Sequence, residues 1–283
     1  MTIIEISDTL KKSLVKLVVI NQKTGNVISQ GSGVVIDANG FVLTANHVVA
    51  LALNEQSYII VGIPYTGSGR IFYSYFFGGI QFSIGQQEMV SPMKVDLAIL
   101  RPLQPNSLPP VILEDIIPKE GTEVIMAGFP EDLKTPLDFA DKFNKQSVGG
   151  EKGIEIIRQF SYSIIPWLML KHGIIGGVSH IFMENTMTEL LGPSTPLSLR
   201  AAEYWIDNTY AKGASGGPVV NREGNLLGII TEVGETTVSD FSETISFPVP
   251  SGSTRVLSHK LITWSIDKLK ERLNSKTDNV HNR

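Results

Sequence analysis

The chain has 283 residues, of which 42% are hydrophobic and 18% charged, a composition that excludes a disordered protein and supplies a sizeable core. With 28 acidic and 24 basic residues the formal net charge is −4, and no block of like charge indicates a nucleic-acid surface. Cysteine is absent, which excludes disulfides and thiolate metal sites. No other metal-ligand cluster or phosphate-binding loop stands out, so we expect no metal and no cofactor.

The first residues, Met1–Lys12, lack the basic start and apolar run of a signal peptide. No apolar run reaches the roughly 18 residues of a membrane-spanning helix. The longest candidate, Ile164–Val178, contains Pro166 and Lys171 and is interpreted as buried strands. We therefore expect no membrane span and a cytoplasmic location.

The chain is expected to open with a short helix that runs into a strand. The helix is predicted over Ser7–Lys16, with Ser7 or Asp8 as its cap. A strand rich in β-branched residues is predicted over Leu14–Ile20. The two predictions overlap, so the boundary between helix and strand is left open.

A hairpin follows. A strand over Gly31–Asp37 leads to Asn39 and Gly40, the strongest short hairpin signal, and Phe41–Thr44 is the return strand. It ends in a segment, 45–49, that is predicted to turn into a short helix.

The rest of the chain consists largely of short apolar or alternating segments between glycine and proline turns. The pattern is broken by a polar surface insertion at 131–154 and an irregular loop at 184–200, and it ends in a helix over 258–274. Strands are expected at 58–64, 71–84, 95–100, 123–130, 154–183 and 219–231. Such spacing favours an all-β barrel or sandwich.

The most informative segment is Gly213–Pro218, with the sequence GASGGP. Small neighbours allow a substrate carbonyl to approach the Ser215 hydroxyl, and glycines allow consecutive N–H groups to point at one spot. Those N–H groups can hold the negative oxygen that forms when a serine attacks a carbonyl. The same residues are also ordinary in a turn between strands.

A serine nucleophile needs a base to take its proton, and histidine has a suitable pKa. Of the five histidines, His47 is the best candidate because it follows an apolar strand at the point where the strand stops. His172 and His180 flank a glycine-rich segment, His259 precedes the terminal helix and His281 lies in the polar tail. A structural role for a lone histidine remains the alternative.

The base needs an acid that orients its ring. Asp96 lies within an apolar run, where a carboxylate without a partner is costly, and a histidine N–H would satisfy it. It can equally accept backbone N–H bonds or pair with Lys94 or Arg101. Asp207 is the rival acid, for which we favour a loop-ordering role.

In the order His47, Asp96 and Ser215, the chain resembles the trypsin-like (chymotrypsin-fold) serine peptidases, and most of all their HtrA (Deg) branch. The segments that carry the resemblance are 31–49, 95–100 and 213–229. The resemblance covers roughly residues 14–251, interrupted by the insertion. It implies an all-β fold of two six-stranded antiparallel β-barrels with a C-terminal α-helix, and a site in the crevice between the barrels.

The family roles carry over to matching positions. The resemblance implies that His47 is the general base, that Asp96 orients it and that Ser215 is the nucleophile, forming an acyl-enzyme. It assigns the N–H groups of Gly213 and Ser215 to the oxyanion hole. Contacts to an extended polypeptide substrate fall to Thr209, Thr231, Glu232 and Val233, and valine at position 233 indicates a shallow pocket for small or medium aliphatic side chains.

The family pattern also divides the chain. It implies an N-terminal barrel with the short helix at 1–110, and a C-terminal barrel at 111–283 that carries the insertion and the terminal helix. We expect a protease domain alone, without the PDZ domain of many relatives. The insertion at 131–154 is longer than the usual loop and can cover the cleft or bind a partner protein. The oligomeric state is left open.

Two other functions remain to be weighed against a serine endopeptidase. One is a protease fold used for binding or as a scaffold, with an idle triad. The other is an α/β-hydrolase esterase, because 213–217 matches Gly-x-Ser-x-Gly. That motif requires a helix after the serine, whereas a hairpin is predicted there, and the candidate histidine precedes the serine.

Overall fold

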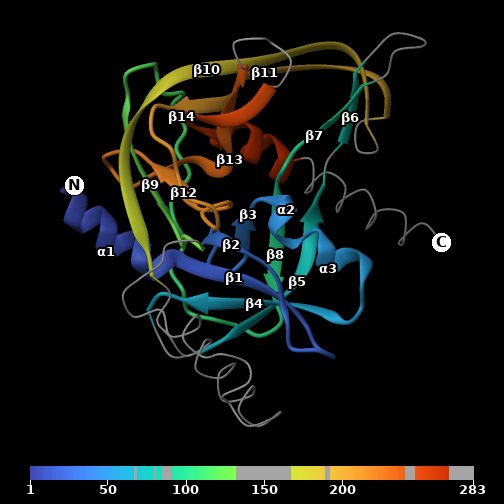
Figure 1. The fold of residues 1–283 in the computed structure, drawn as a ribbon, viewed down its shortest axis with the longest axis vertical. Helices are drawn as coiled ribbons and strands as arrows, with labels where there is room; N and C mark the ends of the chain where they lie inside the picture. The colour runs from blue at the N-terminus through green and yellow to red at the C-terminus, as the bar shows by residue number, and fades with distance from the viewer. Residues whose placement is uncertain are drawn as a thin grey trace, which may run out of the picture.

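The computed structural model describes residues 1–66, 69–79, 81–84, 91–131, 167–188, 192–239 and 246–267. Within these ranges the chain forms two antiparallel β-barrels packed side by side, as the family resemblance implied (Figure 1). The insertion expected at 131–154 lies almost wholly outside the described residues.

Six of the described strands close into the first barrel in the order β1-β2-β3-β8-β5-β4. In β1 the side chains of Val15, Leu17 and Val19 fill the barrel, whereas Leu14 packs into a separate cluster shared with the second barrel. Alternate β-branched and leucine residues thus give each face of the strand its own core. The strands are β1 (Leu14–Asn21), β2 (Val27–Val35), β3 (Val42–Thr44), β4 (Tyr58–Pro64), β5 (Ile71–Gly78) and β8 (Ala98–Pro102).

The predicted hairpin connects β2 to β3. Gly40 adopts φ +79° and donates its N–H to the Asp37 carbonyl at 3.1 Å. The Asp37 carboxylate accepts from the N–H groups of Asn39 and Phe41 at 3.1 and 2.9 Å. A side chain at position 40 would collide with Asn106, so this turn requires glycine for its backbone angle and for space.

In the second half of the described chain, six strands form a ring in the order β11-β14-β13-β12-β9-β10, closed by pairing between β10 and β11. They are β9 (Glu123–Gly128), β10 (Met169–Thr188), β11 (Gly192–Ile206), β12 (Pro218–Val220), β13 (Leu226–Ser239) and β14 (Ser246–Ser258). The prediction of an irregular loop at 184–200 is therefore wrong for the described residues of that segment, which belong to the strands β10 and β11. Register shifts between these two long strands disturb the alternation that marks a strand in sequence.

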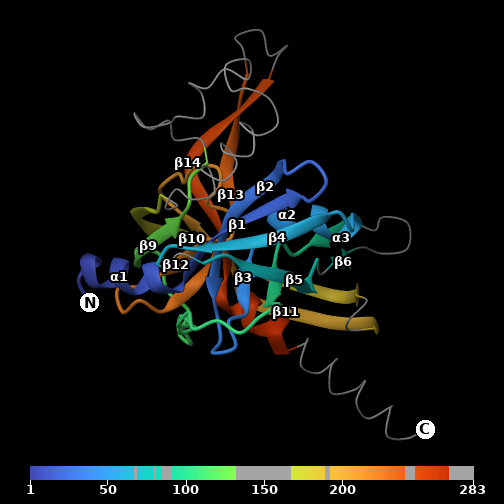
Figure 2. The same ribbon diagram turned by 90° about the horizontal axis from the view of Figure 1, so that it is seen from below.

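A hairpin from the first half of the sequence extends the second sheet. Strands β6 (Gln81–Ile84) and β7 (Ser91–Lys94) pair with each other, and β6 also pairs with the end of β10. The chain then returns to the first barrel through β8. Figure 2 shows the β13–β14 hairpin extending well beyond the barrels.

The N-terminal helix α1 (Ile3–Ser13) begins earlier than predicted. Its cap is Thr2 rather than Ser7 or Asp8, because Thr2 and Glu5 form a reciprocal capping box, with bonds of 3.2 Å from Glu5 N to Thr2 Oγ1 and 2.7 Å from Thr2 N to Glu5 Oε2. Ile6 and Leu10 lie one turn apart and are almost fully buried. They anchor the helix in the cluster shared by both barrels.

Two short helices, α2 (Asn46–Val49) and α3 (Leu51–Asn54), follow β3. At the other end of the chain residues 259–267 are helical and contribute buried Leu261 and Ile262 to the shared cluster. The rest of the helix predicted at 258–274 lies outside the described residues. In the described part of the chain, no helix has the length and apolar character needed to cross a membrane.

Candidate active site

His47 lies at the start of α2, directly after the buried strand β3. Val48 and Val49 in the same helical turn are fully buried in the core of the first barrel. The His47 side chain is left on the outer side and is 52% exposed. Burial of its two neighbours therefore presents the ring to a cavity, as the end of an apolar strand predicted.

Asp96 lies in a bend and not, as predicted, inside a strand. β8 begins only at Ala98, and the N–H of Leu97 donates to the Val95 carbonyl at 2.9 Å, which closes a tight turn around Asp96. Val95 and Leu97 are 2% and 0% exposed. The apolar run that resembled a strand thus anchors both sides of the bend, while the Asp96 side chain stays 32% exposed.

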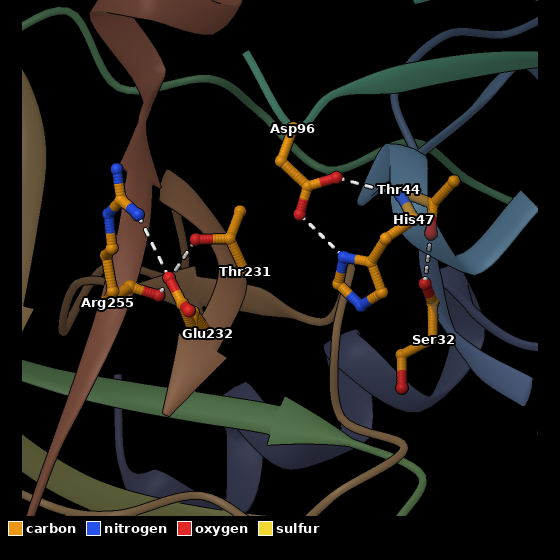
Figure 3. A network of polar contacts seen from close by, with 7 residues as sticks. All are labelled: Ser32, Thr44, His47, Asp96, Thr231, Glu232 and Arg255. Carbon is orange, nitrogen blue, oxygen red and sulfur yellow. Dashed lines mark hydrogen bonds and ion pairs between the residues drawn. The ribbon is translucent and has the colours of Figure 1, made fainter. Parts of the chain in front are cut away.

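The Asp96 carboxylate contacts His47 with both oxygens. Oδ2 lies 2.6 Å from the ring Nδ1, and Oδ1 accepts from the His47 backbone N–H at 2.8 Å. That N–H is one of the first in α2, which no carbonyl of the helix can reach. Figure 3 shows the second ring nitrogen on the side away from Asp96. The carboxylate therefore fixes both the orientation of the ring and the position of the proton on Nδ1.

The pKa of His47 is raised above its ordinary 6.5. The hydrogen bond to Asp96 is the main cause, burial opposes it, and the negative charges of Asp96 and Glu232 add to it. Because the folded-state pKa exceeds the unfolded one, the protonated pair stabilises the fold at low pH. This contribution is lost as pH rises through the folded-state pKa. A neutral ring, able to accept a proton, is accordingly the form present above that pKa.

Ser215 lies in a tight loop that packs against the strand leading to His47. A Cβ on Gly216, whose φ is +83°, would lie 2.2 Å from the Ser32 carbonyl oxygen and 2.9 Å from the Ala45 nitrogen. The Ser215 carbonyl accepts from the Ser32 N–H at 2.8 Å. Only glycine permits this approach, which brings the serine loop of the second barrel against β2 and the end of β3.

Both peptide planes that carry the predicted oxyanion-hole N–H groups are fixed. The Lys212 carbonyl accepts from Glu131 N–H at 2.8 Å, and the Ala214 carbonyl accepts from Gly217 N–H at 2.8 Å. In a trans peptide the N–H points opposite to the carbonyl. The N–H groups of Gly213 and Ser215 are therefore directed away from these bonds, and within the described residues neither donates to a backbone carbonyl.

A cavity of about 360 Å³ opens beside His47 and Asp96. Thr231 and Glu232, both predicted to contact substrate, lie in its wall, and Val233 follows them in β13. The cavity combines apolar and charged side chains: its lining comprises His47, Lys94, Val95, Asp96, Glu203, Thr231, Glu232, Arg255, Leu257 and Leu261.

The edge of β13 becomes free at this cavity. Pairing with β12 ends at Ile229, and the Ile230 backbone bonds to Gly216 and Gly217 at 2.7 and 2.9 Å. Beyond Ile230, in the part of the chain that the structure describes, no strand pairs with this edge. An extended peptide can add to such an edge through backbone hydrogen bonds.

Two further sequence candidates lie apart from the pair formed by His47 and Asp96. The Thr209 carbonyl accepts a hydrogen bond from Lys171 Nζ, and Thr209 is not among the described residues that line the cavity. Asp207 accepts from the Ile174 N–H at 2.7 Å, which fits the loop-ordering role that we favoured for it.

Sequence reasoning missed an ion-pair network in the wall of the cavity. Arg255 lies 2.5 Å from Glu203 and 3.0 Å from Glu232, so one guanidinium joins three strands. Figure 3 shows the contact of Arg255 with Glu232. These bonds, Glu203 first, raise the pKa of Arg255. Arg255 and Glu232 face each other because of the register between β13 and β14. Local sequence does not predict this register, so the pair could not be recognised from the sequence.

A two-barrel fold with a carboxylate-oriented histidine and a glycine-rich serine loop at the junction defines the trypsin-like class of serine proteases. Residues 31–229, more than half of the chain, match the family model of the trypsin-like peptidase domain. The chain therefore belongs to the trypsin-like peptidase family. No protein of curated description matches it in sequence.

Solved structures share the fold. The active form of the Rv3671c protease from M. tuberculosis has a TM-score of 0.53 at 17% identity, with 93% of this chain and 83% of that chain covered. An inactive form of Rv3671c gives 0.52 at 17% identity over 93% and 92% of the two chains. A serine-to-alanine variant in the inactive form gives 0.53 at 16% identity over 94% and 90%.

Proposed function

We propose that the chain is a serine endopeptidase in which Ser215 attacks the peptide bond, His47 is general base and then general acid, and Asp96 orients His47. The reaction passes through an acyl-enzyme that water hydrolyses. The observation that carries the proposal is the double contact of the Asp96 carboxylate with His47, since it leaves Nε2 as the ring nitrogen able to accept a proton.

The serine loop supports the same mechanism. Gly216, which follows Ser215, packs closely against Ala45, which lies two residues before His47. This contact brings the serine loop close to the histidine. As Ser215 Oγ attacks, the substrate carbonyl oxygen becomes negative, and the N–H groups of Gly213 and Ser215 would stabilise it. Because their peptide planes are already fixed, this stabilisation requires no rearrangement of the loop during the reaction.

The free edge of β13 supports a polypeptide as substrate. An extended chain would pair with the backbone of Thr231–Val233 and place side chains into the neighbouring cavity. The preference for small or medium aliphatic residues before the cleaved bond, inferred from Val233, stays a prediction. So do the cytoplasmic location and a partner protein at 131–154.

The proposal is tested by casein turnover of a Ser215→Ala variant. Loss of the nucleophile is expected to lower kcat on the order of 10⁶-fold. A Ser57→Ala variant, which removes a hydroxyl bonded to Glu55 in the first barrel, is the matched control and should keep full activity. Retained cleavage by the Ser215→Ala protein would refute the assignment, and a parent protein with no turnover would favour an idle scaffold.

A further inference from the structure

Ser32 in β2 makes four hydrogen bonds although it is fully buried. Its Oγ donates to the Gly213 carbonyl at 2.9 Å and accepts from the Phe129 N–H at 2.9 Å. Its backbone N–H donates to the Ser215 carbonyl at 2.8 Å, and its carbonyl accepts from Thr44 Oγ1 at 2.7 Å. The hydroxyl, the N–H and the carbonyl of this buried residue therefore all have hydrogen-bond partners.

These bonds tie the serine loop to both barrels. The contacts to Gly213 and Ser215 lie on either side of Ala214, and Phe129 directly follows β9 of the second barrel. Thr44 is the last residue of the strand before His47, and Figure 3 shows its hydroxyl directed at Ser32. One residue, through its hydroxyl and its backbone, thus connects the ends of β3 and β9 with the loop that carries the predicted nucleophile.

The hydroxyl holds the one peptide that lies between the two predicted oxyanion-hole N–H groups. The Lys212 and Ala214 carbonyls are fixed by backbone donors, whereas the Gly213 carbonyl is held by Ser32 Oγ. Gly213 has φ +87° and the rotational freedom of glycine. The N–H of the same peptide, on Ala214, donates to the Ala211 carbonyl at 3.2 Å. Without the Ser32 bond this longer contact alone holds the peptide, so the peptide can shift and pull the flanking planes, which carry the N–H groups of Gly213 and Ser215, out of position.

We infer that Ser32 is a positioning residue for the oxyanion hole, holding the Gly213–Ala214 peptide through its hydroxyl and the Ser215 carbonyl through its N–H. This inference rests on the proposed function, since it assumes that Ser215 is the nucleophile and that the N–H of Gly213 stabilises the oxyanion. Because Ser32 is fully buried, it can act on a substrate only through the loop.

The test is a Ser32→Ala variant of the full chain, assayed on a peptide substrate and with a peptide trifluoromethyl ketone, which forms an oxyanion when a serine adds to it. Deletion of a direct oxyanion donor costs about 10²–10³ in kcat, so displacement of the donors is expected to cost about 10–100-fold. KM should stay within about twofold, because β13 is untouched. The Ki of the ketone should rise by the same factor as kcat/KM falls.

The matched control is Ser13→Ala. Ser13 is 1% exposed, and in the described structure its hydroxyl has no hydrogen-bond partner. This variant should leave kcat and Ki unchanged. If Ser32→Ala does not fold, Ser32→Cys replaces it, because a thiol keeps the volume and a weak donor; an intermediate kcat is then expected.

A purely structural role makes a different prediction. A lower melting temperature with kcat within about twofold of the parent would overturn the inference, as would a rise in KM with unchanged kcat. The pH dependence of kcat/KM should keep its acid limb, because the contacts of His47 with Asp96 are not altered. If the parent protein does not react with the ketone at Ser215, the proposed function and this inference both fail. Reaction of the parent with an unchanged Ser32→Ala rate removes the inference alone.

Discussion

Replacing Asp96 by asparagine probes the contact on which the proposed mechanism depends. Asparagine has the shape of aspartate but offers one acceptor oxygen and one NH2 donor. The His47 N–H is a fixed backbone donor, so the asparagine oxygen is expected to keep that bond of 2.8 Å. The NH2 group then faces Nδ1, which must become an acceptor.

This exchange moves the ring proton to Nε2. In that tautomer His47 cannot take a proton from Ser215, although the ring has barely moved. The reverse orientation of the amide would direct NH2 at the His47 N–H, placing two donors against each other. The same substitution in the Ser-His-Asp triad of a serine protease costs on the order of 10⁴ in kcat, or about 5 kcal/mol of transition-state stabilisation. We expect a loss of that order here.

The assay compares kcat and KM of the parent and Asp96→Asn proteins on one peptide over a range of pH. KM should change little, because Asp96 orients the base and does not pair with the substrate backbone. Asp37→Asn is the control: Asp37 also accepts backbone N–H groups in the first barrel, but at the β2–β3 turn. A fall in kcat of less than about tenfold in a folded Asp96→Asn protein would refute the tautomer argument.

Three further outcomes are expected. Glu232→Gln should lower the pKa of His47 and shift the acid limb of the kcat/KM profile to lower pH. The shift should be smaller at high salt, because Glu232 is 62% exposed and its charge is screened. An acid limb that does not move at low salt would count against this coupling. In urea titrations, Gly216→Ala should lower the unfolding free energy by about 1–3 kcal/mol more than the control Gly121→Ala. The two glycines have nearly the same φ, +83° and +85°, but of the two only Gly216 has heavy atoms within 3 Å of an added Cβ. Ile6→Ala should cost about 2–5 kcal/mol in the same titrations if α1 is part of the shared core, and a loss below about 1 kcal/mol would mean that the helix is dispensable.

Local signals in the sequence predicted much of the fold. Alternation of β-branched residues predicted β1, and Asn39 with Gly40 predicted the β2–β3 turn. The end of an apolar strand singled out His47, and glycine flanks singled out Ser215. In each case, the signal in the sequence lies within a few neighbouring residues.

What the sequence did not predict depends on contacts between distant segments. The bend at Asp96 looks like a strand because Val95 and Leu97 are apolar, yet they are buried as anchors of a turn. The pairing of Arg255 with Glu232 depends on the register of two long strands. The four bonds of Ser32 join segments up to 183 positions apart, the distance from Ser32 to Ser215 (215 − 32 = 183), and no local pattern marks them.

The central claim, that Ser215 is activated by His47, is tested most directly by labelling with a fluorophosphonate. Peptide mapping by mass spectrometry after brief exposure should locate one phosphonyl group per chain on Ser215. The adduct should be lost in a His47→Ala variant, because an unassisted serine hydroxyl reacts slowly. Labelling at a different residue, or equally fast labelling of Ser215 without His47, would contradict the account.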